Sequence, residues 1–216
     1  MGADRVFLFD VDNTLLDNDA VRHDLYAHIA HGFGADTRAR YVAIIEELRA
    51  SLGYVDYLGA LQRLRLDRMH DPRLLLVSEY LLEYPFERRL FPGAIDAIAA
   101  LSRRGTVAIL SDGDVVMQPR KVRRSGLWDA VGGRVLIYIH KELMLADVEA
   151  RLPAQHYVMI DDKRRLLTAI KAQWQARVTT VQPLQGHYAV GPSADYSGPA
   201  PDATIPAIAA AAHLDV

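Results

Sequence analysis

The sequence contains no cysteine among its 216 residues, which excludes disulfides and thiolate chemistry. It also lacks a marked excess of charge of either sign. A formal net charge of −2 gives no general electrostatic reason to expect nucleic acid or an anionic membrane as a partner. The apolar runs are too short to span a bilayer, and the first residues do not resemble a signal peptide. We therefore expect a cytoplasmic protein that acts without nucleic acid or membrane.

What the sequence does contain is an alternation of strand and helix patterns. The apolar run Val6–Phe9 is typical of a strand buried on both faces. A helix is predicted to start at Pro92 and to end near Gly105. Four further strands are predicted in the segments TVAIL, RVLIYIH, HYVMIDD and RVTTVQP, with helices between them. Because parallel strands need crossover connections, this rhythm predicts an α/β fold with a Rossmann-like parallel sheet flanked by helices.

Residues 17–85 differ from the rest of the chain. Val21, Leu25 and Ile29 recur every four residues, and further helical spacing follows as far as the segment PRLLLVSEYLLEY. We expect this block to be a helical subdomain inserted into a core domain made of residues 1–16 and 86–216. The Pro-, Gly- and Ser-rich stretch after residue 190 predicts a surface excursion, followed by a short Ala-rich helix.

Polar residues follow four of the predicted strands, in the segments FDVDNT, ILSDGD, YIHK and MIDDK. Ligands of open parallel sheets bind beyond the carboxyl ends of the strands, so these four segments predict one site. Asp10 and Asp12 are spaced so that both carboxylates can enter one small space. Two like charges at that distance require a cation or a shared proton.

In this order, the motifs resemble those of the haloacid dehalogenase superfamily of phosphohydrolases. The residues that carry the resemblance are Asp10, Asp12, Thr14, Ser111, Lys141, Asp161 and Asp162. The resemblance implies a magnesium-dependent phosphatase that acts on a small phosphorylated metabolite. It also implies that the helical insertion is the mobile cap of the family. Mg²⁺ prefers hard oxygen ligands, which the carboxylates supply.

The resemblance implies a role for each motif residue. Asp10 attacks phosphorus to form an aspartyl-phosphate, and Asp12 acts as general acid and base while its main-chain carbonyl binds the metal. Ser111 donates to the phosphoryl group, and Lys141 supplies positive charge. The expected metal site consists of Asp10, Asp12, Asp162 and Asp161, with Asp162 a better match than Asp161 but either able to bind directly. Residues assigned to substrate binding are Thr14, Asp112 and Gly113.

The sequence also supports expectations for residues near the motifs. Pro119 is expected to break or kink its helix. The basic run that contains Arg120 and Lys121 predicts a solvated helix face. Asp112 and Asp114 add negative charge close to Ser111, and Arg22 is a candidate for contacting a substrate anion. Tyrosines of the insertion cannot be assigned to the site from the sequence; they are Tyr54, Tyr57, Tyr80 and Tyr84.

Three other functions remain open at this level. A dehalogenase of the same superfamily would attack carbon without a metal, but such relatives lack the second aspartate, here Asp12. A phosphomutase would differ from a phosphatase only in how long the phospho-enzyme survives. A non-hydrolytic phospho-acceptor or binding protein is the alternative from another class, although every motif residue is retained. The substrate and the choice between monomer and homodimer are not indicated.

Overall fold

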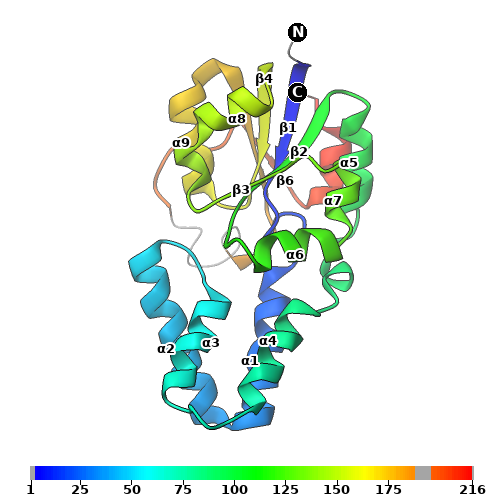
Figure 1. The fold of residues 1–216 in the computed structure, drawn as a ribbon. Helices are drawn as coiled ribbons and strands as arrows, with labels where there is room; N and C mark the ends of the chain where they lie inside the picture. Colours follow the sequence, from blue (N-terminus) through cyan, green and yellow to red (C-terminus); the bar gives the residue numbers. More distant parts are fainter. Residues whose placement is uncertain (1–2, 188–195, 216) are drawn as a thin grey trace.

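The computed structural model describes residues 3–187 and 196–215 and has two parts, a sheet flanked by helices and a bundle of helices below it (Figure 1). The sheet of the described residues has six parallel strands in the order β3-β2-β1-β4-β5-β6. Their bounds are β1 Ala3–Phe9, β2 Thr106–Asp112, β3 Val135–Tyr138, β4 Ala154–Ile160, β5 Val178–Pro183 and β6 Ala203–Ile205. The predicted α/β fold with a parallel sheet is therefore confirmed.

The central strand, β1, is the one that the apolar run Val6–Phe9 predicts. Phe9 is in register with Ile109 of β2 on one side and with Ile160 of β4 on the other. The ladder continues past Phe9, because the backbone N–H of Asp10 donates to the carbonyl of Ile160 at 2.9 Å. Strand order reverses beside β1, which makes its carboxyl end the expected ligand position in a sheet of this kind.

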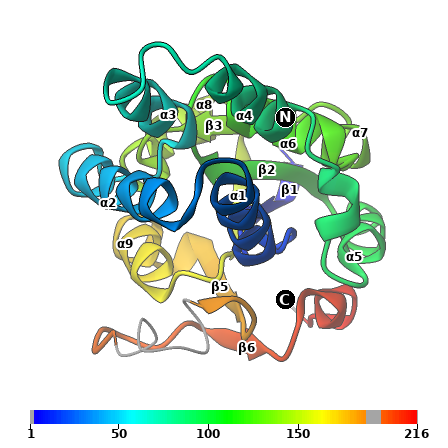
Figure 2. The same cartoon turned by 90° about the horizontal axis from the view of Figure 1, so that it is seen from below.

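Each face of the sheet is covered by its own set of helices, and alternate residues of β1 contribute to the two faces. Phe7 and Phe9 pack into the core beneath α5 and the C-terminal helix η5, whereas Leu8 packs with α8 and α9 on the other face (Figure 2). The bounds of these elements are α5 Ala94–Ser102, α6 Met117–Arg124, α7 Leu127–Ala130, α8 Leu145–Arg151, α9 Arg164–Trp174 and η5 Ile208–His213. Short 3₁₀ turns complete the chain at η1 Phe86–Arg89, η2 Lys141–Leu143 and η3 Gln175–Arg177.

The bundle consists of α1 Asn18–Phe33, α2 Ala35–Leu52, α3 Tyr57–Leu66 and α4 Arg73–Leu82. Helix α1 begins at an N-cap, because the Asp17 carboxylate accepts from the N–H of Ala20 at 2.9 Å. The two chain segments that join bundle and sheet are paired with each other. The N–H of Asp17 donates to Arg89 at 2.7 Å, and the N–H of Phe91 donates to Leu15 at 2.9 Å. The bundle is therefore attached to the sheet through two connecting segments that lie side by side.

Three details differ from the sequence predictions. Helix α5 begins at Ala94 rather than at Pro92. Pro119 does not break or kink its helix, because it lies in the first turn of α6, where its missing N–H has no partner within the helix. The Ala-rich tail is a 3₁₀ helix, and the short strand β6 precedes it. Residues 191–195 of the predicted surface excursion lie outside the described residues.

Within the described ranges, no helix combines the length and the apolar character needed to cross a membrane.

Candidate active site

The carboxyl ends of the four adjacent strands β1 to β4 bring the predicted motif residues to one point. Asp10 follows β1, Ser111 lies at the end of β2, Lys141 follows β3, and Asp161 follows β4. All four side chains are buried. They lie at one level because the strands are parallel and in register, so each strand delivers its last residues to the same edge.

Lys141 is the centre of the buried charge network. Its Nζ lies 2.6 Å from Asp10 Oδ1 and 2.6 Å from Asp161 Oδ2, and it donates to the carbonyl of Leu110 at 3.2 Å. The Lys141 side chain is completely buried, and a buried ammonium requires such partners. Burial alone would lower the pKa of Lys141, but the carboxylates of Asp10 and Asp161 raise it above its ordinary value. Lys141 is therefore a fixed positive charge beside Asp10.

Asp10 is held as a carboxylate by the same network. Burial would raise its pKa, but the charges of Lys141 and Lys163 outweigh that effect and lower the pKa below its ordinary value. The hydroxyl of Ser111 donates to Asp10 Oδ1 at 3.3 Å. Asp10 Oδ2 is buried and has no hydrogen-bond partner among the described residues. The side chain is thus an ionised carboxylate with one oxygen still available.

Three carboxylates form a cluster that fits a metal ion. Oxygens of Asp10, Asp161 and Asp162 lie within 4.8 Å of one another. Both carboxylate oxygens of Asp162 are buried and without a hydrogen-bond partner in the described part of the chain. Burial and the neighbouring charge of Asp161 raise the pKa of Asp162 well above its ordinary value, and the opposing charge of Lys163 does not offset this effect. A hard divalent cation such as Mg²⁺ suits these all-oxygen donors.

Asp161 and Asp162 differ in what already occupies their oxygens. Asp161 Oδ1 accepts from the N–H of Lys163 at 2.7 Å, and its Oδ2 is paired with Lys141. The main chain of Asp162 is held instead, since its N–H donates to Thr14 Oγ1 at 3.0 Å and its carbonyl accepts from Gln182 at 2.9 Å. The Asp162 carboxylate is therefore the one left open for a ligand.

Asp12 lies apart from the carboxylate cluster, in the wall of the adjoining cavity. Its Oδ1 accepts from Lys121 Nζ at 2.6 Å, and the same ammonium donates to Asn18 Oδ1 at 3.0 Å. Asn18 is also 3.5 Å from the hydroxyl of Tyr57, a residue of the bundle. A chain of polar contacts thus runs from the second aspartate of the motif to the helical insertion.

This contact shows that the predicted solvated face of the basic run is wrong for Lys121, whereas the side chains of Arg120, Arg123 and Arg124 are partly or largely exposed. Lys121 is only 1% exposed and is paired with Asp12, and Arg123 stacks on Trp128 with 3.9 Å between guanidinium and ring centroid. Arg120 and Arg124 bind Glu83 and the carbonyls at the end of α4. Sequence spacing could not reveal this, because the basic residues find partners elsewhere in the chain rather than within their own helix.

The residues assigned to substrate binding occupy different positions. Asp112 and Gly113 line the cavity, whereas the Thr14 hydroxyl accepts from the main chain of Asp162 and orders the loop. Asp112 Oδ1 accepts from the N–H of Lys141 at 2.7 Å. A Cβ at Gly113 would lie 2.5 Å from the Gln118 side chain, so only glycine allows this close approach. Gln118 in turn donates to Ser111 Oγ at 3.0 Å.

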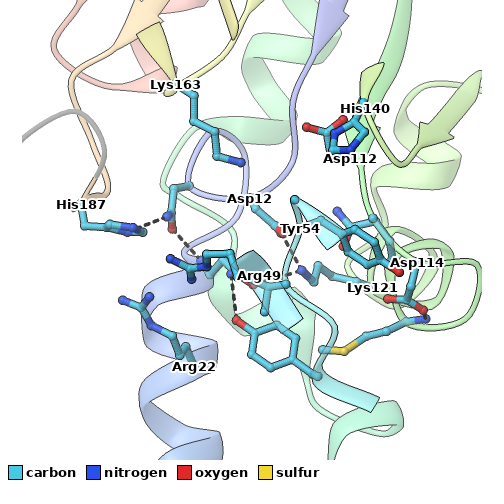
Figure 3. Close-up of a pocket in the computed structure, with 18 of the residues that line it drawn as sticks. Asp12, Arg22, Arg49, Tyr54, Asp112, Asp114, Lys121, His140, Lys163 and His187 are labelled. Atoms are coloured by element: carbon cyan, nitrogen blue, oxygen red, sulfur yellow. Dashed lines mark hydrogen bonds and ion pairs between the residues drawn. The ribbon is translucent and has the colours of Figure 1, made fainter. Parts of the chain in front are cut away.

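The cavity beside these groups has a volume of about 410 Å³ (Figure 3), a size suited to a small ligand. Sheet and bundle both contribute to its wall. Tyr54 and Tyr57 are the two insertion tyrosines that line it, together with Arg22 and Arg49. At Gly53, bundle and core approach closely, since a Cβ there would lie 2.5 Å from His140 Cε1.

Among the residues of this region that sequence reasoning missed are Gln118, Lys121 and Arg49. A signal existed for the first two. They lie three residues apart at the start of the helix that follows Ser111, so they share a face directed back toward the strand end. No comparable signal marks Arg49, which lies near the end of a long helix whose orientation depends on tertiary packing.

Comparison with known proteins places these features in context. The family model for haloacid dehalogenase-like hydrolases matches residues 5–172. A haloacid dehalogenase-like hydrolase from Burkholderia xenovorans LB400 is 59% identical, with a TM-score of 0.94 and 99% of each chain covered. The HAD-hydrolase YfnB from Bacillus subtilis, in a magnesium-bound crystal form, is 18% identical, with a TM-score of 0.64 and 97% of each chain covered.

A third structure is that of the defluorinating L-2-haloacid dehalogenase Rha0230. It is 16% identical, has a TM-score of 0.64, and is matched over 97% of the present chain and 94% of its own. At such identities the likeness to YfnB and to Rha0230 concerns the fold alone. No curated protein matches the sequence.

Proposed function

Because the chain belongs to the haloacid dehalogenase-like hydrolases, we propose that it is a magnesium-dependent phosphatase of small phosphorylated metabolites. The observation that carries this proposal is the placement of two carboxylates in different surroundings. Asp10 lies buried against Lys141 and the acidic cluster, while Asp12 lies in the cavity wall beside Lys121. One group is suited to nucleophilic attack and the other to proton transfer.

Asp10 is the proposed nucleophile. Its carboxylate forms a bond to phosphorus as the bond from phosphorus to the leaving oxygen breaks, and Asp12 gives that oxygen a proton. Asp12 then takes a proton from a water that attacks phosphorus, which releases inorganic phosphate and restores Asp10. Lys141 and the Ser111 hydroxyl, both within reach of Asp10 Oδ1, would stabilise the phosphoryl oxygens.

Asp10 and Asp162 would hold the metal through their free carboxylate oxygens, together with the main-chain carbonyl of Asp12. Asp161 would act mainly by orienting Lys141, because both of its oxygens already have partners. When bound, magnesium would neutralise the acidic cluster and polarise the phosphoryl group. The magnesium-bound form of YfnB supports this assignment by analogy of fold.

The bundle α1–α4 is proposed to act as a cap. It contributes Asn18, Tyr54 and Tyr57 to the cavity wall, so it would exclude water and select the leaving group. Its attachment through two paired segments next to Leu15 and Phe91 would allow it to move as one unit.

Release of p-nitrophenol from p-nitrophenyl phosphate tests this function. Wild type and Asp10→Asn are assayed with Mg²⁺ and with a chelator, and Asp96→Asn on the exposed start of α5 is the matched control. We expect activity in the wild type and in the control with Mg²⁺ only, and none in Asp10→Asn. Full activity in Asp10→Asn would exclude the proposed nucleophile.

A dehalogenase is the competing enzyme, and Asp12 argues against it. Halide release from 2-chloropropionate under the same conditions separates the two functions. Halide release that depends on Asp10 but not on Mg²⁺, without phosphatase activity, would replace the proposal. A phospho-enzyme that transfers its phosphoryl group to a second metabolite rather than to water would indicate a phosphomutase.

A further inference from the structure

The charges in the cavity wall are unevenly distributed. The part of the wall that comes from the bundle contains Arg22 and Arg49 and, among the described residues, no carboxylate. The lining carboxylates come from the core: Asp112 and Asp114 lie at and just after the end of β2, and Asp12 lies in the loop after β1 (Figure 3). The core side of the wall has charges of both signs, since Lys121, Lys163, Arg164 and Arg165 also line it, whereas the described bundle side has positive charges only.

Arg49 has hydrogen-bonding capacity that the described residues do not use. Its Nε is buried and lacks a hydrogen-bond partner among them, and its one ion pair, with Glu46, is long at 3.6 Å. Glu46 lies one turn earlier on α2 and is more than half exposed. A buried guanidinium N–H without an acceptor is costly, and a planar donor group of this kind suits a carboxylate or a phosphate.

Arg22 is held in place beside the same part of the cavity. Its Nη2 donates to Asp19 Oδ1 at 3.2 Å, and that oxygen is 2.7 Å from Nδ1 of His187. Arg22 and Arg49 both lie close enough to His187 to contribute to the lowering of its pKa, which burial causes in the first place. The two guanidinium groups therefore act on the same small region, although they come from different helices.

We infer that Arg22 and Arg49 bind a second anionic group of the substrate. This inference rests on the proposed phosphatase function and specifies its substrate class. The substrate is a phosphate monoester whose leaving group carries a carboxylate or a second phosphate, positioned by the bundle while the first phosphate is cleaved at Asp10. An uncharged sugar or alcohol leaving group would offer Arg49 only neutral acceptors, whereas a carboxylate or phosphate also supplies the opposite charge.

The test uses three series of phosphate monoesters of increasing chain length: ω-carboxyalkyl phosphates, their methyl esters, and the corresponding bisphosphates. Each acid differs from its methyl ester mainly by one charge, so the ratio of their kcat/KM values isolates the second anion. In the wild type with Mg²⁺, we expect the kcat/KM of an acid or a bisphosphate of matching length to exceed that of the methyl ester by about tenfold or more. Comparison of the first and third series shows whether the anion is a carboxylate or a phosphate.

The variants are Arg49→Met, Arg49→Lys and the double change Arg22→Met with Arg49→Met. Arg63→Met, on the exposed surface of α3 and outside the cavity wall, is the matched control. We expect the preference for the second anion to disappear in the double variant, mainly through KM, and to survive in part in Arg49→Lys. Arg63→Met should keep the wild-type ratio. Thermal unfolding of each variant shows that it is folded.

A binding measurement provides a readout that does not depend on turnover. Calorimetric titration of Asp10→Asn in Mg²⁺ with the same acids and esters should show tighter binding of the acid. This difference should be absent when Arg22 and Arg49 are also replaced.

Two results would overturn the inference separately. Equal hydrolysis and equal binding of acid and ester at every chain length, with hydrolysis still dependent on Asp10, would overturn the second-anion site and leave the phosphatase intact. Absence of hydrolysis and of binding for every phosphate ester would overturn the phosphatase and the inference with it.

Discussion

The ammonium group of Lys121 lies 2.6 Å from Asp12 Oδ1, although 109 residues separate the two in the sequence. The lysine comes from the helix that follows Ser111, and the aspartate from the loop after β1. The same lysine contacts Asn18, the first residue of the bundle. The core and the insertion together therefore determine the position and the contacts of Asp12, the proposed general acid and base.

Replacement of Lys121 by methionine should reduce activity in a way that depends on the leaving group. Without the ion pair, Asp12 is no longer held at the cavity wall, so protonation of the leaving oxygen should suffer. An alkyl phosphate, which needs that proton, should lose about 10²-fold in kcat. Hydrolysis of p-nitrophenyl phosphate, whose leaving group needs it less, should lose far less. Equal losses for both esters would contradict this role, and Arg123→Met on the same helix is the control.

Replacement of Asp162 by asparagine should stabilise the metal-free protein. The Asp162 carboxylate is buried, has no hydrogen-bond partner in the described structure and is close to Asp161. Removal of this charge should raise the free energy of unfolding in a chelator by about 1–3 kcal/mol. Denaturant unfolding with and without Mg²⁺ measures this change in stability.

In the same measurement, Mg²⁺ should stabilise the wild type through binding to the folded state and should stabilise Asp162→Asn much less. A loss of stability in Asp162→Asn in the chelator would show that the carboxylate has a favourable partner and would contradict the assignment.

Replacement of Gly53 by alanine should separate backbone strain from contact between bundle and core. Gly53 has a φ of +79°, and a Cβ there would meet His140 Cε1 at 2.5 Å. Gly126 has nearly the same conformation, with a φ of +81° and open space around it. Gly126→Ala should cost about 1 kcal/mol, and Gly53→Ala about 1–3 kcal/mol more.

His140→Ala in the Gly53→Ala background should recover part of that additional loss, as a double-mutant cycle would show. Equal stability changes for Gly53→Ala and Gly126→Ala would mean that the bundle yields to the added methyl group.

Replacement of Phe7 by alanine should strongly destabilise the protein. Phe7 is completely buried in the centre of the sheet, so the change leaves a cavity and should lower the free energy of unfolding by about 3–5 kcal/mol. Leu66→Ala, at a side chain that is 72% exposed, should change it by less than about 0.5 kcal/mol. Chemical denaturation compares the two, and similar values would place Phe7 outside the cooperative core.

Local pattern predicted the sheet and the meeting of its motif residues well. The strand Val6–Phe9 and the alternation after residue 92 depend on hydrophobic periodicity, which is a property of neighbouring residues. Parallel strands then bring their carboxyl ends to one edge, so Asp10, Ser111 and Lys141 could be placed together before any coordinates were known.

The features that were not predicted depend on partners distant in the sequence. Lys121 resembles any residue of a basic helix until Asp12 is placed opposite it. Strand β6 is only three residues long and gains its stability from pairing with β5, so its own sequence carries little signal. The sequence alone does not show that Pro119 falls in the first turn of α6, where its missing N–H has no partner within the helix.

The central position of β1 also determines when the site can form during folding. Its neighbours β2 and β4 begin at residues 106 and 154, whereas the bundle is built from the continuous segment 18–82. Closing such long loops is slow compared with the docking of adjacent helices. A partly folded chain in which only the bundle has formed therefore does not yet have Lys141 and Asp162 positioned beside Asp10. We expect recovery of enzymatic activity during refolding to follow completion of the sheet and to lag behind recovery of helical structure.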